Sequence, residues 1–436
     1  QLKLKLNDSK ATRWGALVIV AFTMMAAYYV NDVVAPLKTM LETDLAWSST
    51  DFGFFTGGYS FLNVFFLMLI WGGLILDRFG IRFTGKLATI LMVGGTALEY
   101  YAMTGLAGAD ATLFGINEIL GYKTGVFVAF AGYSIFGVGA EVAGITVSKI
   151  IAKWFKGKEL ATAMGVQVAL ARIGSQAGYA VAIPLARAFG ISTPVLLGLV
   201  LLLGGMIAFF IFAVMDKKLD KQMEAAAIAA GTEDEEEKFS FKDVKNILVN
   251  PGFWLIALLC VLFYSCVFPF QKFASELMII KYGINENVAG TFAGLPALGA
   301  LILTPVFGGF IDKRGKSASI MLLGSAMLIC VHFIYAIPDI NYWLVAIVLM
   351  IILGIAFSLV PSAMWPAVAK IFPVSQLGTA YALIFFIQNI GLWGIPTLIG
   401  WVLDAYCISG KKPDGTNMYD YTAVSYTHLT LPTSDL

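Results

Sequence analysis

The chain has 436 residues, of which 59% are hydrophobic and only 13% are charged, and its formal net charge is +1. Soluble domains carry about a quarter charged residues, so this composition excludes an ordinary soluble protein, and the balanced charge by itself indicates no class of partner. A membrane-spanning helix needs about 20 mostly apolar residues, and runs of that length recur along the chain. We therefore expect an all-α polytopic membrane protein embedded in a lipid bilayer.

Six apolar runs in the first half of the chain predict membrane spans, at about residues 13–36, 52–75, 86–106, 124–150, 159–187 and 192–215. Together they would form an N-terminal six-helix bundle over residues 1–215. The first span carries Tyr28, an aromatic residue that could line a cavity or simply pack, and Asp32, a candidate proton carrier or ligand.

A short charged turn follows the second span and recurs after the eighth with the same spacing, Gly-x-x-x-Asp-basic-x-Gly. Its residues are Gly73, Asp77, Arg78, Gly80 and Arg82 in the first copy and Gly308, Asp312, Lys313 and Gly315 in the second. Glycine permits a tight reversal and close helix approach, and an acid at a helix end can pair with basic groups of a facing helix. A plain loop does not need the fixed spacing, so we interpret the turns as gates in a duplicated chain.

Two opposite charges lie deep inside consecutive predicted spans. A charge at the membrane centre costs about 2.5–3.5 kcal/mol, so each needs a partner or a function. Glu141 precedes Lys153 by 12 residues and Arg172 follows Lys158 by 14. At 1.5 Å per residue they lie about 18 Å and about 21 Å from the connecting loop. At that common depth they would suit the two ends of a zwitterion, or would neutralise each other as a structural ion pair.

Other polar and aromatic residues inside the spans are also candidates. Glu99 of the third span is a candidate site residue or a residue near the outer interface, and Lys272 of the seventh can extend its amine towards the membrane surface. Tyr264 and Trp365 would line a cavity or serve in packing. His332 is expected to be a buried structural histidine, and no residue spacing predicts a metal or another cofactor.

The second half of the chain begins after a long polar segment, residues 216–251, whose acidic run at 233–237 predicts a solvated cytoplasmic linker. Five spans follow, at about residues 252–280, 287–311, 318–337, 342–368 and 376–404. This C-terminal bundle, residues 252–404, is one helix short of the first. Residues 405–436 form a polar loop and a tail that, from Ser425, resembles translated sequencing-adapter read-through. We therefore expect a non-native tail in place of a twelfth helix.

Lysine and arginine are concentrated in alternate loops, which predicts the orientation of the chain. Clusters follow the second, fourth and eighth spans, whereas the intervening loops carry single basic residues such as Lys38, Lys123 and Lys281. Because positive charge marks the cytoplasmic side, we expect a cytoplasmic N-terminus.

The two charged turns on a twelve-span plan resemble the major facilitator superfamily. This resemblance implies two six-helix bundles that rock about a central site, exposing it to each side of the membrane in turn. Further segments are similar to the lysosomal dipeptide uniporter branch of that superfamily, the group of major facilitator superfamily domain-containing protein 1. They are Trp154–Leu160, Ala171–Ser175, Trp365–Pro366 and residues 376–391.

In that branch an acid of the fourth span and an arginine of the fifth hold the dipeptide termini, and Glu141 and Arg172 occupy those positions. The resemblance thus implies that Glu141 binds the substrate amine and Arg172 the carboxylate. Lys272 departs from the position of the lysine in that branch, so the resemblance implies no role for it. The acid-rich first-span motif of proton-coupled peptide transporters is absent.

We therefore predict a transporter, not an enzyme, that carries small zwitterionic peptides such as dipeptides by alternating access. One alternative is an organic-anion carrier in which Arg172 binds a carboxylate and Glu141 shuttles a proton. A more remote alternative is a receptor or scaffold that transports nothing. We predict no nucleic-acid partner, and the adapter-like tail favours an environmental source and hence a bacterial plasma membrane.

Overall fold

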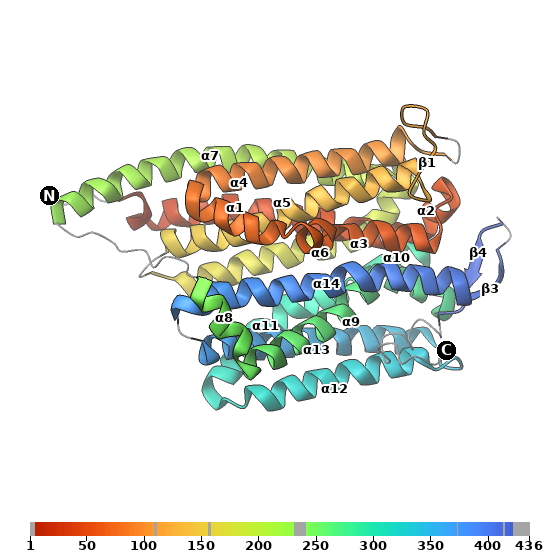
Figure 1. Cartoon of the computed structure of the whole chain (residues 1–436). Helices are drawn as coiled ribbons and strands as arrows, with labels where there is room; N and C mark the ends of the chain where they lie inside the picture. Colours follow the sequence, from red (N-terminus) through yellow and green to blue (C-terminus); the bar gives the residue numbers. More distant parts are fainter. Residues whose placement is uncertain are drawn as a thin grey trace.

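The computed structural model describes residues 5–108, 111–155, 158–230, 241–372, 374–412 and 415–421. Its long helices lie side by side along a common direction (Figure 1). The first half of the chain supplies α1 (Lys10–Val33), α2 (Lys38–Leu45), α3 (Ser49–Phe65), α4 (Met68–Thr104), α5 (Thr124–Trp154), α6 (Leu160–Phe189) and α7 (Thr193–Ala230). The second half supplies α9 (Pro251–Tyr282), α10 (Glu286–Ala293), α11 (Leu295–Arg314), α12 (Ser317–Ala336), α13 (Trp343–Ile371) and α14 (Val374–Tyr406).

The remaining described elements are short. They are the 3-10 turns η1 (Leu6–Asp8) and η2 (Ala35–Leu37), helix α8 (Phe241–Val249), and strands β1 (Glu118–Ile119), β2 (Tyr122–Lys123), β3 (Ile408–Lys411) and β4 (Asn417–Tyr419). The strands pair as two antiparallel hairpins, β1 with β2 and β3 with β4. Both hairpins lie at the right-hand end of the molecule in Figure 1.

The lengths and apolar compositions of the helices confirm the predicted all-α membrane fold. Among the described residues, eight helical segments are long and apolar enough to cross a membrane, and the bent pair α3 and α4 makes a ninth. Helix α6 is outside that set although it is 30 residues long. It carries polar residues, Gln167, Arg172 and Gln176 among them, along its length.

The second predicted span, residues 52–75, is broken in the structure. The chain leaves helical geometry at Leu67, whose φ is +54°, and α3 and α4 meet at an angle of 58°. The predicted turn falls inside the residues of α4, at Gly80, where φ is +74° and ψ is 174°. Gly315, which ends α11, has φ +66°. Residues with a side chain rarely adopt this region, so both glycines permit the reversals that their motif predicts.

Each half packs its own helices together and meets the other along two seams. In the first half α4 packs on α5, and α1 on α6 and α7; in the second half α13 packs on α11 and α12. Between the halves, α3 lies along α14, and α6 lies against α10 and α11. The α3–α14 seam is a backbone contact, because a Cβ at Gly53 would lie 2.4 Å from the carbonyl oxygen of Pro396. Small residues permit such approach in membranes.

Helix α7 corrects the predicted boundary of the linker. It continues to Ala230, so the first part of residues 216–251 is helical. Asp216 is fully buried there, and accepts hydrogen bonds from Trp154 Nε1 at 3.0 Å and Lys153 Nζ at 2.8 Å. The solvated linker that we predicted therefore does not begin at residue 216. The acidic run 233–237 and the tail from residue 422 lie outside the described residues.

Two names help to describe the site. We call the end of the helices with the turns at Gly80 and Gly315 the gate end. The opposite end, which carries Lys38, Glu276 and both β-hairpins, is the sealed end.

Candidate functional site

Glu141 and Arg172 lie on neighbouring helices, α5 and α6, and are both partly buried. The Tyr59 hydroxyl on α3 donates a hydrogen bond to Glu141 Oε1 at 3.0 Å. The Arg172 guanidinium lies over two rings, 5.6 Å from that of Tyr28 on α1 and 5.0 Å from that of Phe357 on α13. Among the described residues no ion pair joins Glu141 to Arg172, so in this conformation the two charges do not neutralise each other directly.

Close helix packing explains how these side chains are positioned. A Cβ at Gly137 would lie 2.1 Å from the Tyr59 carbonyl oxygen, so α5 runs directly against α3. Glu141 follows Gly137 by one helical turn and therefore meets the Tyr59 side chain. In the same way, a Cβ at Gly174 on α6 would lie 2.1 Å from the Met25 carbonyl oxygen on α1, so these two helices are also in close contact. Arg172 is two residues from Gly174 on α6, and its side chain lies beside Tyr28, which is on α1 like Met25.

The second half contributes an aromatic wall. Trp365 Nε1 on α13 donates to the Tyr264 hydroxyl on α9 at 3.2 Å. The Tyr381 hydroxyl on α14 donates to the Trp365 carbonyl oxygen at 3.0 Å. Phe357 lies 6.3 Å from Tyr264 and 5.4 Å from Phe268, centroid to centroid. A continuous series of contacts therefore runs from Arg172 in the first half to Trp365 in the second.

Four of the five residues predicted to bind substrate thus fall in one region at the interface between the halves, and the fifth, Glu141, contacts Tyr59 of the first half. Tyr28 contacts Arg172, and Phe357 links Arg172 to Tyr264 and Trp365. Tyr59 and Phe357 were not among the predicted site residues. A tyrosine one helix away from a buried acid, or a phenylalanine within a long apolar run, has no local signal that distinguishes it from a packing residue.

Asp32 and Lys272 form a buried ion pair between the halves. Lys272 Nζ on α9 lies 3.0 Å from Asp32 Oδ1 on α1, and Ser175 Oγ donates to Asp32 Oδ2 at 2.6 Å. Both side chains are 10% exposed. The prediction that Lys272 extends towards the membrane surface is therefore wrong, because Asp32 supplies a buried counter-charge. Asn31 Nδ2 also donates to Asp32 Oδ1 at 2.9 Å, so Asp32 is held by three side chains in this conformation.

Two further predicted residues are buried. Glu99 is fully buried on α4, and neither of its carboxylate oxygens has a hydrogen-bond partner in the described part of the chain. His332 on α12 is 1% exposed and meets the Phe270 ring edge-on at 4.8 Å, as expected of a structural histidine.

The charged residues of the gate turns make the following contacts. Asp77 accepts from Lys149 Nζ of α5 at 3.0 Å, and Arg82 contacts Asp216 and Asp220 of α7, so the first turn pairs within its own half. Among the described residues no ion pair joins the first turn to the second. The side chain of Asp312 lies outside the described part of the structure. A Cβ at Gly73 or Gly308 would meet nothing within 4 Å, so in this conformation neither glycine makes the close approach that we predicted.

Contacts between the halves are instead gathered towards the sealed end. Besides Lys272 with Asp32, Lys38 pairs with Glu276 at 2.5 Å and Arg187 pairs with Glu286. The Thr50 amide also donates to Asp404 Oδ2 at 2.6 Å. The sealed end is therefore closed by ionic contacts, and none is seen between the described residues of the two gate turns.

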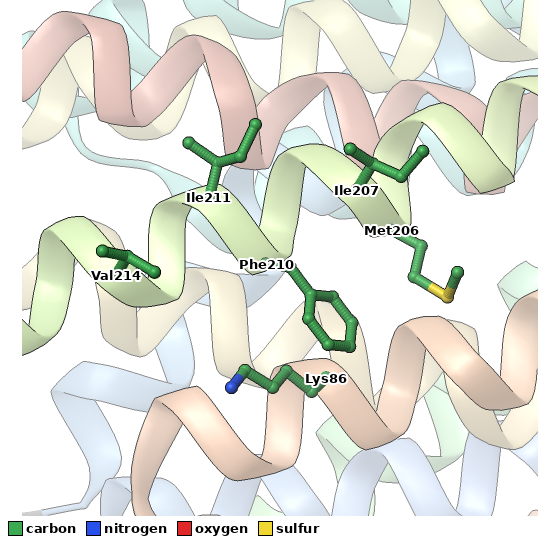
Figure 2. Close-up of a pocket in the computed structure, with 6 residues that line it drawn as sticks. All are labelled: Lys86, Met206, Ile207, Phe210, Ile211 and Val214. Atoms are coloured by element: carbon green, nitrogen blue, oxygen red, sulfur yellow. The ribbon is translucent and has the colours of Figure 1, made fainter.

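A groove on the outer surface is distinct from this site (Figure 2). It is lined by Lys86 of α4 and by apolar residues of α7, namely Met206, Ile207, Phe210, Ile211 and Val214. Lys86 Nζ lies 5.2 Å from the centre of the Phe210 ring. Ile207, Ile211 and Val214 are each more than half exposed, as expected of a face in contact with lipid.

Comparisons with known proteins agree with the fold. A model of the Major Facilitator Superfamily matches residues 17–394. The chain is 29% identical over 409 residues to the lysosomal dipeptide transporter MFSD1 of Homo sapiens, covering 91% of this chain and 81% of that protein.

Two solved structures share the fold. A mutant of the nucleoside transporter NupG aligns with a TM-score of 0.69 at 12% identity, covering 95% of both chains. The xylose transporter XylE from E. coli, in an inward open conformation, aligns with a TM-score of 0.66 at 15% identity, covering 96% of this chain and 94% of that one. A multi-pass membrane protein is thereby supported. The sequence relative is a lysosomal animal protein, so the predicted bacterial plasma membrane gains no support.

Proposed function

Because the chain belongs to the Major Facilitator Superfamily, we propose that it carries small zwitterionic peptides, dipeptides first, across a membrane by alternating access. One observation carries this proposal: a partly buried acid and a partly buried arginine lie on neighbouring helices, the arginine contacts the second half, and among the described residues neither is paired with the other. The name of the human relative, a dipeptide transporter, points to the same substrate class.

The substrate would supply the counter-charges that the site lacks. Leaving a buried charge without a partner is costly, so a ligand with both a cation and an anion gains from binding here. Glu141, held by Tyr59, would accept hydrogen bonds from the peptide ammonium. Arg172 would form two parallel hydrogen bonds to the peptide carboxylate, since its guanidinium matches that geometry.

The aromatic wall would contact the peptide side chains. Phe357, Tyr264 and Trp365 offer apolar surface with hydroxyl and indole groups at its edge. Because these residues are on α9 and α13, the substrate would contact both halves at once. A ligand that contacts both halves can favour their closure around it, as alternating access requires.

The two ends of the helices would then open in turn, with the N-terminus in the cytoplasm. The ionic contacts at the sealed end, and the absence of any between the described residues of the gate turns, would fit a state closed at one end. Asp77 and Asp312 would pair with the facing half when the gate end closes and release it when that end opens.

Uptake by proteoliposomes tests this proposal. A labelled dipeptide should accumulate inside the proteoliposomes by exchange with unlabelled dipeptide loaded there beforehand. Unlabelled dipeptides added outside should compete with its uptake, whereas free mono- and dicarboxylates at the same concentration should not. Glu118→Gln, which alters an exposed charge outside the site, should transport as the original chain does. Competition by free organic acids alone would instead establish the organic-anion alternative.

A further inference from the structure

The outer groove between α4 and α7 combines apolar walls with a cation. It has a volume of about 520 Å³ and is lined by Lys86 of α4 and by apolar side chains of α7. Figure 2 shows the Lys86 and Phe210 side chains extending towards each other from these two helices. Ile207, Ile211 and Val214 of α7 are 60%, 54% and 58% exposed. The groove is therefore open to the membrane, where a lipid chain can enter it.

Close packing of the two helices places the Lys86 amine inside the groove. Gly85 packs directly against the Phe209 ring, because an added Cβ there would overlap the ring. Lys86 is the next residue, and its Nζ lies 5.2 Å from the centre of the Phe210 ring. Lys86 follows Gly80 of the gate turn by six residues, or about 9 Å at 1.5 Å per residue. A charge at that depth gains from an anion beside it or must extend to the polar surface.

The side of α7 that lines the groove continues into three lysines towards the gate end. Lys217, Lys218 and Lys221 follow Val214 by three, four and seven residues, so they lie on the same side of the helix as Val214. All three are exposed. Lys221 lies about 10 Å beyond Val214 along the helix. We call Lys86 and these three residues the lysine stripe.

The lysine stripe lacks the acid partners that other cations at the gate end have. Arg82 and Lys153 each pair with Asp216 and Asp220, on the side of α7 that faces the protein. Within the described residues, no member of the stripe forms an ion pair. Glu224, one turn beyond Lys221, is exposed and pairs with none of them. An unneutralised positive stripe therefore borders the gate end of an apolar groove.

We propose that the lysine stripe and the groove together bind one anionic phospholipid from the leaflet at the gate end. The phosphate would lie among the lysine amines, which bind phosphate as point charges. One acyl chain would lie along Ile207, Ile211 and Val214, and its packing against them would add dispersion contacts. This inference needs neither the dipeptide substrate nor alternating access.

Charge complementarity favours an anionic lipid over a neutral one. Basic residues beside a membrane attract anionic lipids, and each lysine near the surface contributes about fivefold in affinity. A zwitterionic headgroup carries its own cation, which the lysines repel. A free phosphate would meet the amines but would leave the groove empty. The site thus requires both parts of the ligand, the anionic headgroup and the acyl chain.

Native mass spectrometry of the purified chain in detergent tests this inference, because it counts bound lipids directly. Dioleoyl phosphatidylglycerol should bind at least about fivefold more tightly than dioleoyl phosphatidylcholine, which has no net charge. Glycerol phosphate, which has no acyl chain, should not displace the bound lipid. Phosphatidylglycerol should also raise the melting temperature, since a ligand that binds the folded state stabilises it.

Matched variants identify the lysines responsible. Lys86→Gln should weaken phosphatidylglycerol binding about fivefold, and Lys217→Gln combined with Lys221→Gln about 30-fold. The control combines Lys245→Gln of α8 with Lys370→Gln of α13, which removes two exposed lysines outside the stripe and should keep the original affinity.

Equal binding of the two phospholipids, or stripe variants that bind phosphatidylglycerol as tightly as the control does, would overturn the inference. A dimer that binds no phosphatidylglycerol in these spectra would also overturn it, because a second copy of the chain would then cover the groove. A chain that binds phosphatidylglycerol as expected but no dipeptide would refute the proposed substrate and leave the lipid site standing.

Discussion

Replacement of Arg172 by lysine would test how the candidate site holds a carboxylate. The guanidinium lies 5.6 Å from the ring of Tyr28 and 5.0 Å from that of Phe357, so rings from both halves support it. Lysine keeps the positive charge but loses the planar fork that binds both oxygens of a carboxylate. The lost ring contacts cost about 0.5–2 kcal/mol, and the second hydrogen bond to a charged group costs about 1.5 kcal/mol or more. Together we expect a loss of about 2–3.5 kcal/mol, or roughly 30- to 300-fold weaker dipeptide binding.

Isothermal titration of purified protein with a dipeptide measures this loss. Arg187→Lys is the matched control, because it makes the same change at the exposed end of the same helix. Its dissociation constant should stay within about twofold of the original, a difference of about 0.4 kcal/mol. A similarly small change for Arg172→Lys would refute the assignment of Arg172 to the substrate carboxylate.

Three further substitutions have distinct expected outcomes. Glu141→Gln should weaken dipeptide binding by about 1.5–3 kcal/mol, the range for a hydrogen bond to a charged group, and titration with unchanged affinity would make Glu141 structural. Gly53→Ala should lower the melting temperature, with a loss of about 1–3 kcal/mol, because its Cβ would lie 2.4 Å from the Pro396 carbonyl oxygen; an unchanged melting temperature would mean that α3 and α14 separate easily. Asp216→Asn should cost about 3 kcal/mol or more, since it uncouples a fully buried acid from Lys153 and Arg82. Asp220→Asn, at a half-exposed position, should lose less stability than Asp216→Asn in the same thermal unfolding assay. Equal losses of stability would argue against burial as the cause.

The helices and the reversals at the gate end could be predicted from sequence because their signals are local. Long apolar runs predict spans wherever they occur. The glycines of the repeated turn predict positive φ, which Gly80 and Gly315 both adopt. The depth of Glu141 and Arg172 follows from helical rise alone. Arg172 contacts Phe357 of the second half, and Glu141 contacts Tyr59 of the first.

Features that depend on distant parts of the chain could not be predicted in this way. The ion pair of Lys272 with Asp32 joins residues on α9 and α1, and nothing in either span indicates the other. Phe357 supports Arg172 from the other half, yet in sequence it is one more phenylalanine in an apolar run. Contacts of this kind follow from the packing of the halves.

The continuation of α7 to Ala230 was missed for a different reason. Polarity alone indicated a linker after residue 215. Residues 216–230 nevertheless contain five alanines and three lysines, which favour helix. Helix propensity would have predicted the extension, and with it the burial of Asp216 against Trp154.

The central claim is that Glu141 and Arg172 recognise the two ends of a zwitterion, and ligands that lack one charge test it most directly. Dissociation constants should be measured for a free dipeptide, its N-acetyl form and its C-terminal amide, on the original chain, on Glu141→Gln and on Arg172→Gln. The original chain should reject both modified peptides. Glu141→Gln should cease to distinguish the N-acetyl form from the free dipeptide while still rejecting the amide, and Arg172→Gln should do the reverse. Variants that keep the selectivity of the original chain for both modified ends would contradict the account.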